Sequence, residues 1–129
     1  MKILLVDDHV PTREQVKFIL GLEPDLQVVA DVGSAEAGIE AARQYLPDVV
    51  VMDIMLPGMN GINATAAILA ERPETRVLAL SNHAGAALVR AVLNAGALGF
   101  VSKHRAAEEL IPAIRAVAAG KRYLGNGAE

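Results

Sequence analysis

Five polar residues stand directly after four apolar segments of the chain, and their chemical types point to one kind of reaction. Asp7 and Asp8 follow the first segment, and Asp53, Ser81 and Lys103 follow three later ones. Three carboxylates held together repel one another, and a divalent cation that prefers oxygen ligands, such as Mg²⁺, relieves that repulsion. With a metal ion, an ammonium group and a hydroxyl group, such a cluster has what phosphoryl transfer requires, because this chemistry depends on positioning and charge neutralisation. A carboxylate that attacks phosphorus becomes an acyl phosphate.

Each of these residues also has a simpler explanation, which we favour when the residue is considered singly. Aspartates are common where a strand turns into a helix, Ser81 suits a turn, and Lys103 suits a solvated charge at a strand end. The prediction of a functional site rests on five matching groups at the ends of four strands that are neighbours in the expected sheet.

The apolar run at residues 49–52 predicts a central parallel strand, because strands that are buried on both faces read as continuous apolar runs. Asp53 then lies at the carboxyl end of this strand, where open α/β sheets bind ligands. Pro57 and Gly58 suit a tight turn. Asn60 can cap a helix that begins directly after it.

Further apolar segments at residues 2–6, 26–30, 77–80 and 99–102 predict four more strands. The segments between and after the strands carry apolar residues at helical spacing and predict five helices. The third helix is expected at residues 62–71. The apolar faces expected for the others are Val16, Ile19 and Leu20 in the first; Ile39, Ala42 and Leu46 in the second; Leu88, Val89, Val92 and Leu93 in the fourth; and Leu110, Ile114, Val117 and Ala118 in the fifth.

Local residue types set the expected ends of these helices. Pro11 suits the first turn of the first helix, Ser34 is the expected cap of the second, and Pro47 ends the second. Pro112 conflicts with the fifth helix, because an interior proline removes a hydrogen bond and clashes with the preceding turn. We therefore predict that this helix begins late, near Glu108 or the residue after it, with a modest kink as the alternative.

Five consecutive strand–helix units without a linker-like segment predict an α/β fold, namely a flavodoxin-like doubly wound (βα)5 sandwich. Its parallel five-stranded sheet is expected in the order 2-1-3-4-5. In that order the first, third, fourth and fifth strands are neighbours, so the five polar residues that follow them converge on one edge of the sheet.

Composition agrees with this fold and excludes several functions. The 129 residues suit one domain, and 53% hydrophobic with only 3% aromatic residues indicates an aliphatic core. A net charge of −3 without a basic stripe argues against direct binding of nucleic acid. The absence of cysteine excludes disulfides and thiolate sites. Because neither a signal peptide nor a membrane-spanning apolar stretch is evident, we predict a soluble cytoplasmic protein.

On these residues the chain is similar to the receiver domains of two-component response regulators. The likeness covers roughly residues 2–120 and rests on the acidic pair Asp7 and Asp8, on Asp53 in the sequence DIMLPGMNG, on Ser81, and on Lys103 in GFVSK. The sequences VDDH with a following arginine, PDVV and AAGKRYL resemble the NarL/FixJ branch, in which a LuxR-type DNA-binding domain usually follows.

The resemblance implies specific roles at the site. Asp53 would accept a phosphoryl group from a sensor histidine kinase. Asp8, Asp53 and the backbone carbonyl of Met55 would hold Mg²⁺, and Asp7 would reach the ion through water. Ser81 would bond one phosphoryl oxygen. Lys103 would pair with another.

The resemblance also implies a switch. Phe100 matches the aromatic residue that turns inward when Ser81 moves toward the phosphate, which would alter the face formed by the fourth helix, fifth strand and fifth helix. Ordinary core packing is the alternative role for Phe100. The protein would not be an enzyme in the usual sense, because it would catalyse only its own phosphotransfer and a slow autodephosphorylation. A homodimer that forms on phosphorylation is consistent with the resemblance.

The resemblance divides the chain into a receiver domain at residues 1–120 and the start of a linker at residues 121–129, with the DNA-binding output domain absent from this chain. A stand-alone receiver and a receiver-like interaction module that works without phosphorylation are the alternatives. Two departures concern the neighbours of the site. His104 stands where most receivers have proline, and Met55 has a thioether that cannot act as a base, so we hypothesise that it hinders water. His83 is interpreted as an exposed loop residue.

Three other classes that share the topology or the chemistry fit less well. A flavin-binding domain needs a hydroxyl- and glycine-rich loop after the first strand, where this chain has the acidic sequence DDHVP. A cobalamin-binding domain needs a glycine where Thr12 stands. A phosphohydrolase with an aspartate nucleophile usually carries a second acid at the position of Met55.

Overall fold

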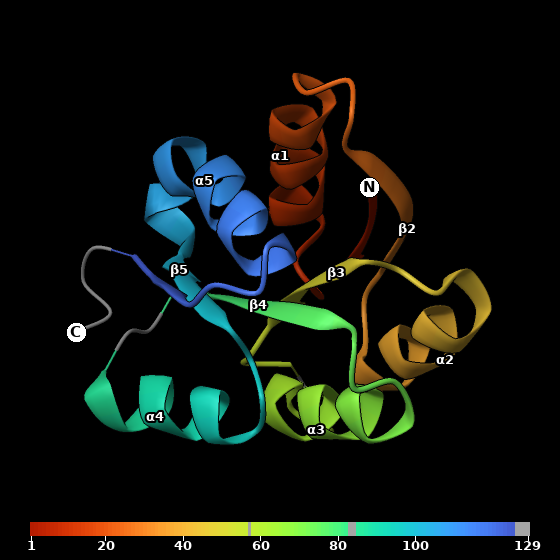
Figure 1. Cartoon of the computed structure of the whole chain (residues 1–129), viewed down its shortest axis with the longest axis vertical. Coiled ribbons are helices and arrows are strands. Elements are labelled where there is room, and N and C mark those ends of the chain that lie inside the picture. Colours follow the sequence, from red (N-terminus) through yellow and green to blue (C-terminus); the bar gives the residue numbers. More distant parts are fainter. Residues whose placement is uncertain (57, 83–84, 126–129) are drawn as a thin grey trace.

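The computed structural model describes residues 1–56, 58–82 and 85–125, and over these residues a parallel sheet lies between two layers of helices (Figure 1). The strand order is β2-β1-β3-β4-β5-β6. The strands are β1 (Lys2–Val6), β2 (Gln27–Val32), β3 (Val49–Asp53), β4 (Arg76–Ser81), β5 (Gly99–Ser102) and β6 (Tyr123–Leu124). The helices are α1 (Val10–Gly21), α2 (Ala35–Tyr45), α3 (Gly61–Glu71), α4 (Ala86–Asn94) and α5 (Ala106–Ala118), with a 3₁₀ turn η1 (Lys103–Arg105) before α5.

This architecture confirms the predicted fold class and the predicted order of the first five strands. The bounds of β1 and β5 agree with the prediction. The second strand lies further along the chain than predicted, so that Asp31 is inside β2 rather than after it. The predicted helix caps are also confirmed, because Ser34 Oγ accepts a hydrogen bond from Ala37 N (3.1 Å) and Asn60 Oδ1 accepts one from Asn63 N (2.9 Å).

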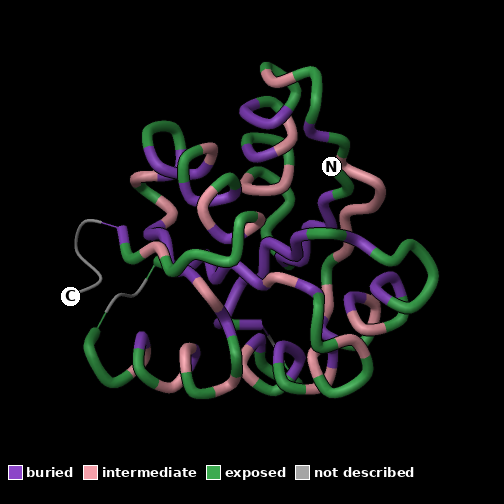
Figure 2. Tube along the Cα trace, viewed as in Figure 1, coloured by how far each residue is buried: buried purple, intermediate pink, exposed green. Residues whose placement is uncertain are grey.

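The core consists of two apolar layers, one on each face of the sheet (Figure 2). Alternate residues of β3 enter opposite layers: Val50 and Met52 pack toward α2, α3 and α4, whereas Val49 and Val51 pack toward α1 and α5. All five residues of β3 are buried, as the continuous apolar run predicts. This central strand therefore holds its carboxyl end rigidly, and Asp53 is its last residue.

The predicted apolar face of the second helix was wrong in one member. Ala42 is buried and Ile39 is partly buried against the core, but Leu46 is 45% exposed. Leu46 lies one residue past the end of α2 with a positive φ of 49°. The following residue, Pro47, disfavours the helical conformation at this position, so the Leu46 side chain leaves the apolar face.

The predicted late start of the fifth helix was also wrong. Helix α5 begins at Ala106, and Pro112 lies inside it. Loss of one backbone hydrogen bond and the steric clash cost about 3 kcal/mol. Burial of Leu110, Ile114 and Val117, each completely inaccessible, contributes roughly 1.5–3 kcal/mol per side chain. Packing of the apolar face therefore outweighs the local cost of the proline.

A sixth strand was not predicted. Residues 123–124 pair in parallel with β5, and Tyr123 N and Gly125 N donate hydrogen bonds to Leu98 O (3.0 Å) and Phe100 O (2.9 Å). The segment that was interpreted as a linker thus covers the edge of the sheet at least as far as Gly125. Among the described helices, none combines the length and the apolar character needed to cross a membrane.

Candidate functional site

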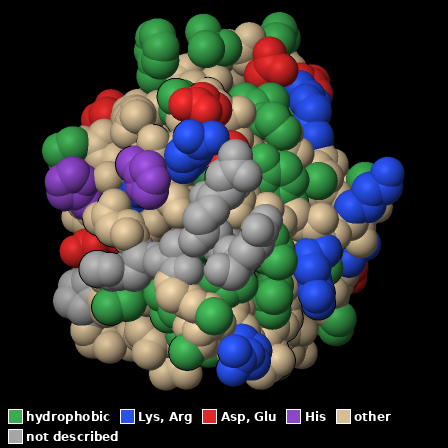
Figure 3. Space-filling model, turned by 90° about the vertical axis from the view of Figure 1, so that its left-hand side faces the viewer, with side chains coloured by type: hydrophobic (Ala, Val, Ile, Leu, Met, Phe, Trp, Pro, Cys, Tyr) green, Lys and Arg blue, Asp and Glu red, His purple; other side chains and the backbone are tan. Residues whose placement is uncertain are grey.

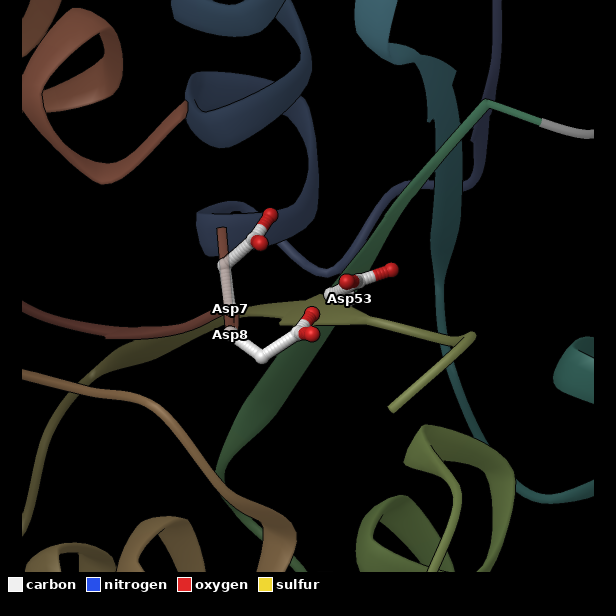
Figure 4. A group of neighbouring side chains, drawn as sticks. All are labelled: Asp7, Asp8 and Asp53. Carbon is white, nitrogen blue, oxygen red and sulfur yellow. The ribbon is translucent and has the colours of Figure 1, made fainter. Parts of the chain in front are cut away.

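The polar residues singled out in the sequence meet at the carboxyl edge of the sheet. Asp7 follows β1, Asp53 ends β3, Ser81 ends β4 and Lys103 follows β5. Figure 4 shows the side chains of Asp7, Asp8 and Asp53 next to one another at the ends of β1 and β3, and one carboxylate oxygen from each lies within 4.8 Å of the others. Figure 3 views this edge from outside, with acidic, basic and histidine side chains close together in its upper part.

Asp7 is fully buried, and its backbone N donates a hydrogen bond to Val32 O (3.0 Å). Its Oδ1 atom accepts a hydrogen bond from His9 N (2.8 Å), and its backbone carbonyl accepts one from Arg13 Nη1 (2.6 Å). Its Oδ2 atom lies 2.8 Å from Lys103 Nζ in an ion pair. Both oxygens of the buried carboxylate therefore have a partner, a backbone N–H group for one and an ammonium group for the other.

Asp53 is 4% exposed and shares the lysine with Asp7. Its Oδ1 atom accepts a hydrogen bond from Met55 N (3.1 Å), and its Oδ2 atom lies 3.4 Å from Lys103 Nζ. Burial, and next the negative charge of Asp7, raise the pKa of Asp53 despite the opposing effect of Lys103. Burial acts to lower the pKa of Lys103, but the two carboxylates outweigh it and the pKa is raised. The lysine is thus held protonated between two acids.

The open side of the cluster is a hollow of about 200 Å³. Asp8 is exposed there, in contrast to Asp7 and Asp53. Oxygen ligands on the wall of a small, solvent-accessible hollow suit a hard cation that retains several waters. The residues that line the hollow are Asp8, His9, Asp53, Met55, Asn82 and Lys103.

Ser81 and Phe100 take different positions relative to this cluster. Ser81 is fully buried at the same edge, opposite Ser102 in the β4–β5 register. Phe100 lies further back, paired with Ala79 and completely buried in the layer beneath α4. The inward position of Phe100 is compatible with both of the roles considered for it. The turn at Pro57 and the side chain of His83 lie outside the described residues.

Sequence reasoning did not place two further residues at the site. Arg13 contacts the backbone of Asp7, and Asn82 lines the hollow. Helical spacing could have placed Arg13 near the start of α1, but its contact with Asp7 O depends on how the β1–α1 turn folds.

The chain matches the family model of the response regulator receiver domain over residues 3–115. Among curated proteins it is similar to the transcriptional regulatory protein DegU of Brevibacillus brevis (41% identity over 124 residues) and to the response regulator UvrY of Escherichia coli (34% over 126 residues). These alignments cover 96% and 98% of this chain but 52% and 58% of the relatives, so the chain spans about half of their length.

Solved structures agree with the match to the receiver domain model. A LuxR-family two-component response regulator from Aurantimonas superimposes with a TM-score of 0.94 at 37% identity, covering 98% of this chain and 91% of that one. The signal receiver domain of the putative regulator NarL from Mycobacterium tuberculosis gives a TM-score of 0.88 at 34% identity, covering 93% and 97%.

The chain therefore belongs to the response regulator receiver domain family. Its relatives place it more narrowly, as a receiver domain of a two-component response regulator of the LuxR/NarL family.

Proposed function

We propose that Asp53 accepts a phosphoryl group from a sensor histidine kinase. The observation that carries this proposal is the position of Lys103, whose ammonium group lies 2.8 Å from Asp7 and 3.4 Å from Asp53 at a three-carboxylate edge. One lysine does not balance three acids, and a buried pair of charges is weak support for stability. An arrangement that keeps excess negative charge beside a hollow is instead suited to a cation and a phosphoryl group.

In the proposed step, a carboxylate oxygen of Asp53 forms a bond to phosphorus while the bond from phosphorus to the kinase imidazole nitrogen breaks. The leaving nitrogen keeps the electron pair of the broken bond, and the product is an acyl phosphate. Lys103 neutralises charge on the phosphoryl oxygens, and Ser81 donates a hydrogen bond to one of them. Met55 N orients the Asp53 carboxylate through the 3.1 Å hydrogen bond.

Mg²⁺ is the proposed cofactor, and the residues present fit it. Asp8, Asp53 and the backbone carbonyl of Met55 would hold the ion, with Asp7 reaching it through water. The grouping of one carboxylate oxygen from each of the three acids within 4.8 Å supports this choice. When bound, the ion supplies positive charge to the phosphoryl oxygens.

The proposed output is a change on the α4–β5–α5 face. Movement of Ser81 toward the phosphoryl group would open space beside β4, into which Phe100 would turn further. This change would control a LuxR-type DNA-binding domain following residues 121–129, and hence transcription, through a phosphorylation-dependent homodimer in the cytoplasm. The name of DegU, a transcriptional regulatory protein, supports this reading. Slow autodephosphorylation would end the signal.

The test is the intact mass of the protein after incubation with acetyl phosphate and Mg²⁺. The wild-type protein is expected to gain one phosphoryl group, and Asp53→Asn is expected to gain none. The matched control is Asp48→Asn, because Asp48 precedes the same strand at its opposite end and its carboxylate accepts a hydrogen bond only from Lys2 N (2.8 Å) among the described residues. This control should be phosphorylated like the wild type.

Absence of phosphorylation in folded wild-type protein would refute the proposal and favour a receiver-like interaction module. Equal phosphorylation of the wild type and Asp53→Asn would refute the assignment of the acceptor. Phosphorylation that persists in EDTA would refute the metal requirement.

A further inference from the structure

Arg13 joins the turn that carries the acidic pair to the neighbouring strand. The guanidinium donates one hydrogen bond from Nη1 to the backbone carbonyl of Asp7 (2.6 Å) and another from Nε to Asp31 Oδ1 (3.2 Å). Asp31 belongs to β2, and the side chain of Arg13 is only 19% exposed. The short contact with Asp7 is charge-assisted and therefore stronger than a hydrogen bond between neutral groups.

The surroundings of Arg13 fix its planar group in this position. Lys17, one turn further along α1, lies 3.4 Å from the second oxygen of Asp31, so both oxygens of that carboxylate are occupied. Gly33 leaves room for the guanidinium, because a Cβ atom at this position would lie 3.1 Å from Arg13 Nη1. A lysine at position 13 has a single ammonium group and cannot reproduce the two directed contacts of the fork.

We propose that Arg13 is a positioning residue for the metal-binding acids, an inference that rests on the proposed function. Asp7 has its side chain held by His9 N and Lys103, while Arg13 holds its backbone carbonyl and Val32 O accepts a hydrogen bond from its backbone N (3.0 Å). Asp8 is the next residue and is exposed, without a hydrogen bond to its carboxylate among those found in the described structure. The contact of Arg13 with the preceding carbonyl therefore orients the peptide unit from which the Asp8 side chain projects.

This role becomes larger when Lys103 turns to a phosphoryl group. In that state the lysine would share its charge between the phosphoryl oxygens and Asp7. Arg13 is not among the residues that line the hollow, and its hydrogen bond is to the main chain, so this contact would be kept. The Arg13 guanidinium would then hold the backbone of Asp7 both before and after phosphorylation.

A positioning role and a purely electrostatic role of Arg13 predict opposite changes in Mg²⁺ affinity when Arg13 is removed. Removal of a positive charge near a cation site should strengthen Mg²⁺ binding if charge alone matters. Removal of the group that orients the acids should weaken it. Supporting contacts around metal ligands typically change affinity by about 10–100-fold, and because Arg13 acts through the main chain we expect about tenfold weaker binding in Arg13→Gln.

The experiment is titration calorimetry with Mg²⁺ on the full chain at 25 °C, where the protein is shown to be folded by circular dichroism. Arg13→Gln should bind Mg²⁺ about tenfold more weakly than the wild type, and Arg13→Lys should also bind more weakly than the wild type, because it keeps the charge but not the fork. The matched control is Arg43→Gln. Arg43 likewise bridges two elements, through hydrogen bonds to both oxygens of Glu71 (2.8 and 2.9 Å), but lies between α2 and α3, outside the hollow.

Unchanged or tighter Mg²⁺ binding by folded Arg13→Gln would overturn the inference and leave Arg13 as a purely structural tie between β2 and the β1–α1 turn. An equal loss in Arg43→Gln would do the same. If the wild-type protein itself neither bound Mg²⁺ nor became phosphorylated by acetyl phosphate, the proposed function would be refuted. If only the Arg13 variants behaved differently from expectation, the proposed function would stand and the role of Arg13 would be refuted.

Discussion

Replacement of the proposed phosphoacceptor, Asp53→Asn, is expected to stabilise the metal-free protein. The pKa of Asp53 is raised, so its ionised form is less favourable in the folded state than in the unfolded chain. Asparagine has nearly the same shape and keeps an oxygen that can accept the hydrogen bond from Met55 N. The substitution removes a buried charge and its repulsion by Asp7 without leaving a cavity.

The size of the gain follows from the distances. At an effective dielectric constant of about 20, the attraction of Lys103 at 3.4 Å is worth roughly 5 kcal/mol, and repulsion by a carboxylate within 4.8 Å is worth at least roughly 3.5 kcal/mol. These two effects nearly cancel, so the burial of Asp53, which costs several kcal/mol, decides the sign. Allowing about 1 kcal/mol for the weaker hydrogen bond to a neutral acceptor, we expect a net gain of about 1–2 kcal/mol.

The assay is thermal unfolding in EDTA. With about 2.1 cal/mol/K per residue, 129 residues correspond to roughly 4 °C for each kcal/mol, so the midpoint should rise by about 4–8 °C. Mg²⁺ should then stabilise the wild type but hardly the variant. Asp48→Asn is the control and should show no gain. A lower midpoint for Asp53→Asn at pH 7 would refute the reasoning.

The pH dependence gives an independent check. Because the folded-state pKa of Asp53 is raised above 3.8, the carboxyl group contributes stability that is fully present below pH 3.8 and is lost as the pH rises through the folded-state value. The advantage of Asp53→Asn should therefore be absent at low pH and grow as the pH rises. An advantage that is constant across this range would point to packing instead of charge.

Two further predictions concern the rim and the tail. If exposed Met55 hinders water, Met55→Asn should speed loss of the phosphoryl group by roughly fivefold, equivalent to about 1 kcal/mol, in an intact-mass time course; an unchanged rate would contradict this. Gly125→Val should detach β6, because a Cβ there would overlap Glu109 Oε1, costing about 1–2 kcal/mol and increasing amide exchange at Tyr123. Gly21→Ala, where a Cβ meets nothing within 4 Å, is the control, and unchanged exchange in Gly125→Val would refute the docking argument.

Several features of the fold could be predicted because they depend on residues that are close together in the sequence. The all-apolar run of β3 marks a strand buried on both faces, and Ser34 and Asn60 mark helix starts through side-chain caps. The meeting of Asp7, Asp53 and Lys103 followed from one additional rule, that parallel strands present their carboxyl ends at the same edge. The two ion pairs of Lys103, with Asp53 and Asp7, join residues 50 and 96 positions apart (103 − 53 and 103 − 7), and the topology made both predictable.

Other features depended on competition between local and tertiary effects. Pro112 opposes helix formation locally, and the buried face of α5 outweighs it. The strand β6 has two residues, too few for a periodic signal, and it exists because the edge of β5 supplies partners for its backbone. A pattern in the sequence measures only the local side of such a competition.

The sequence by itself determined the order of the strands and the kinds of groups at the carboxyl edge, because apolar periodicity and strand ends are properties of neighbouring residues. Only the tertiary structure decided which of those groups contact one another and which face the solvent. The single ammonium of Lys103 lies between Asp7 and Asp53, Asp8 remains in the solvent, and the guanidinium of Arg13 contacts a backbone carbonyl. These relations depend on distances of a few ångströms between side chains, which are set by packing and by the electrostatics of the buried charges.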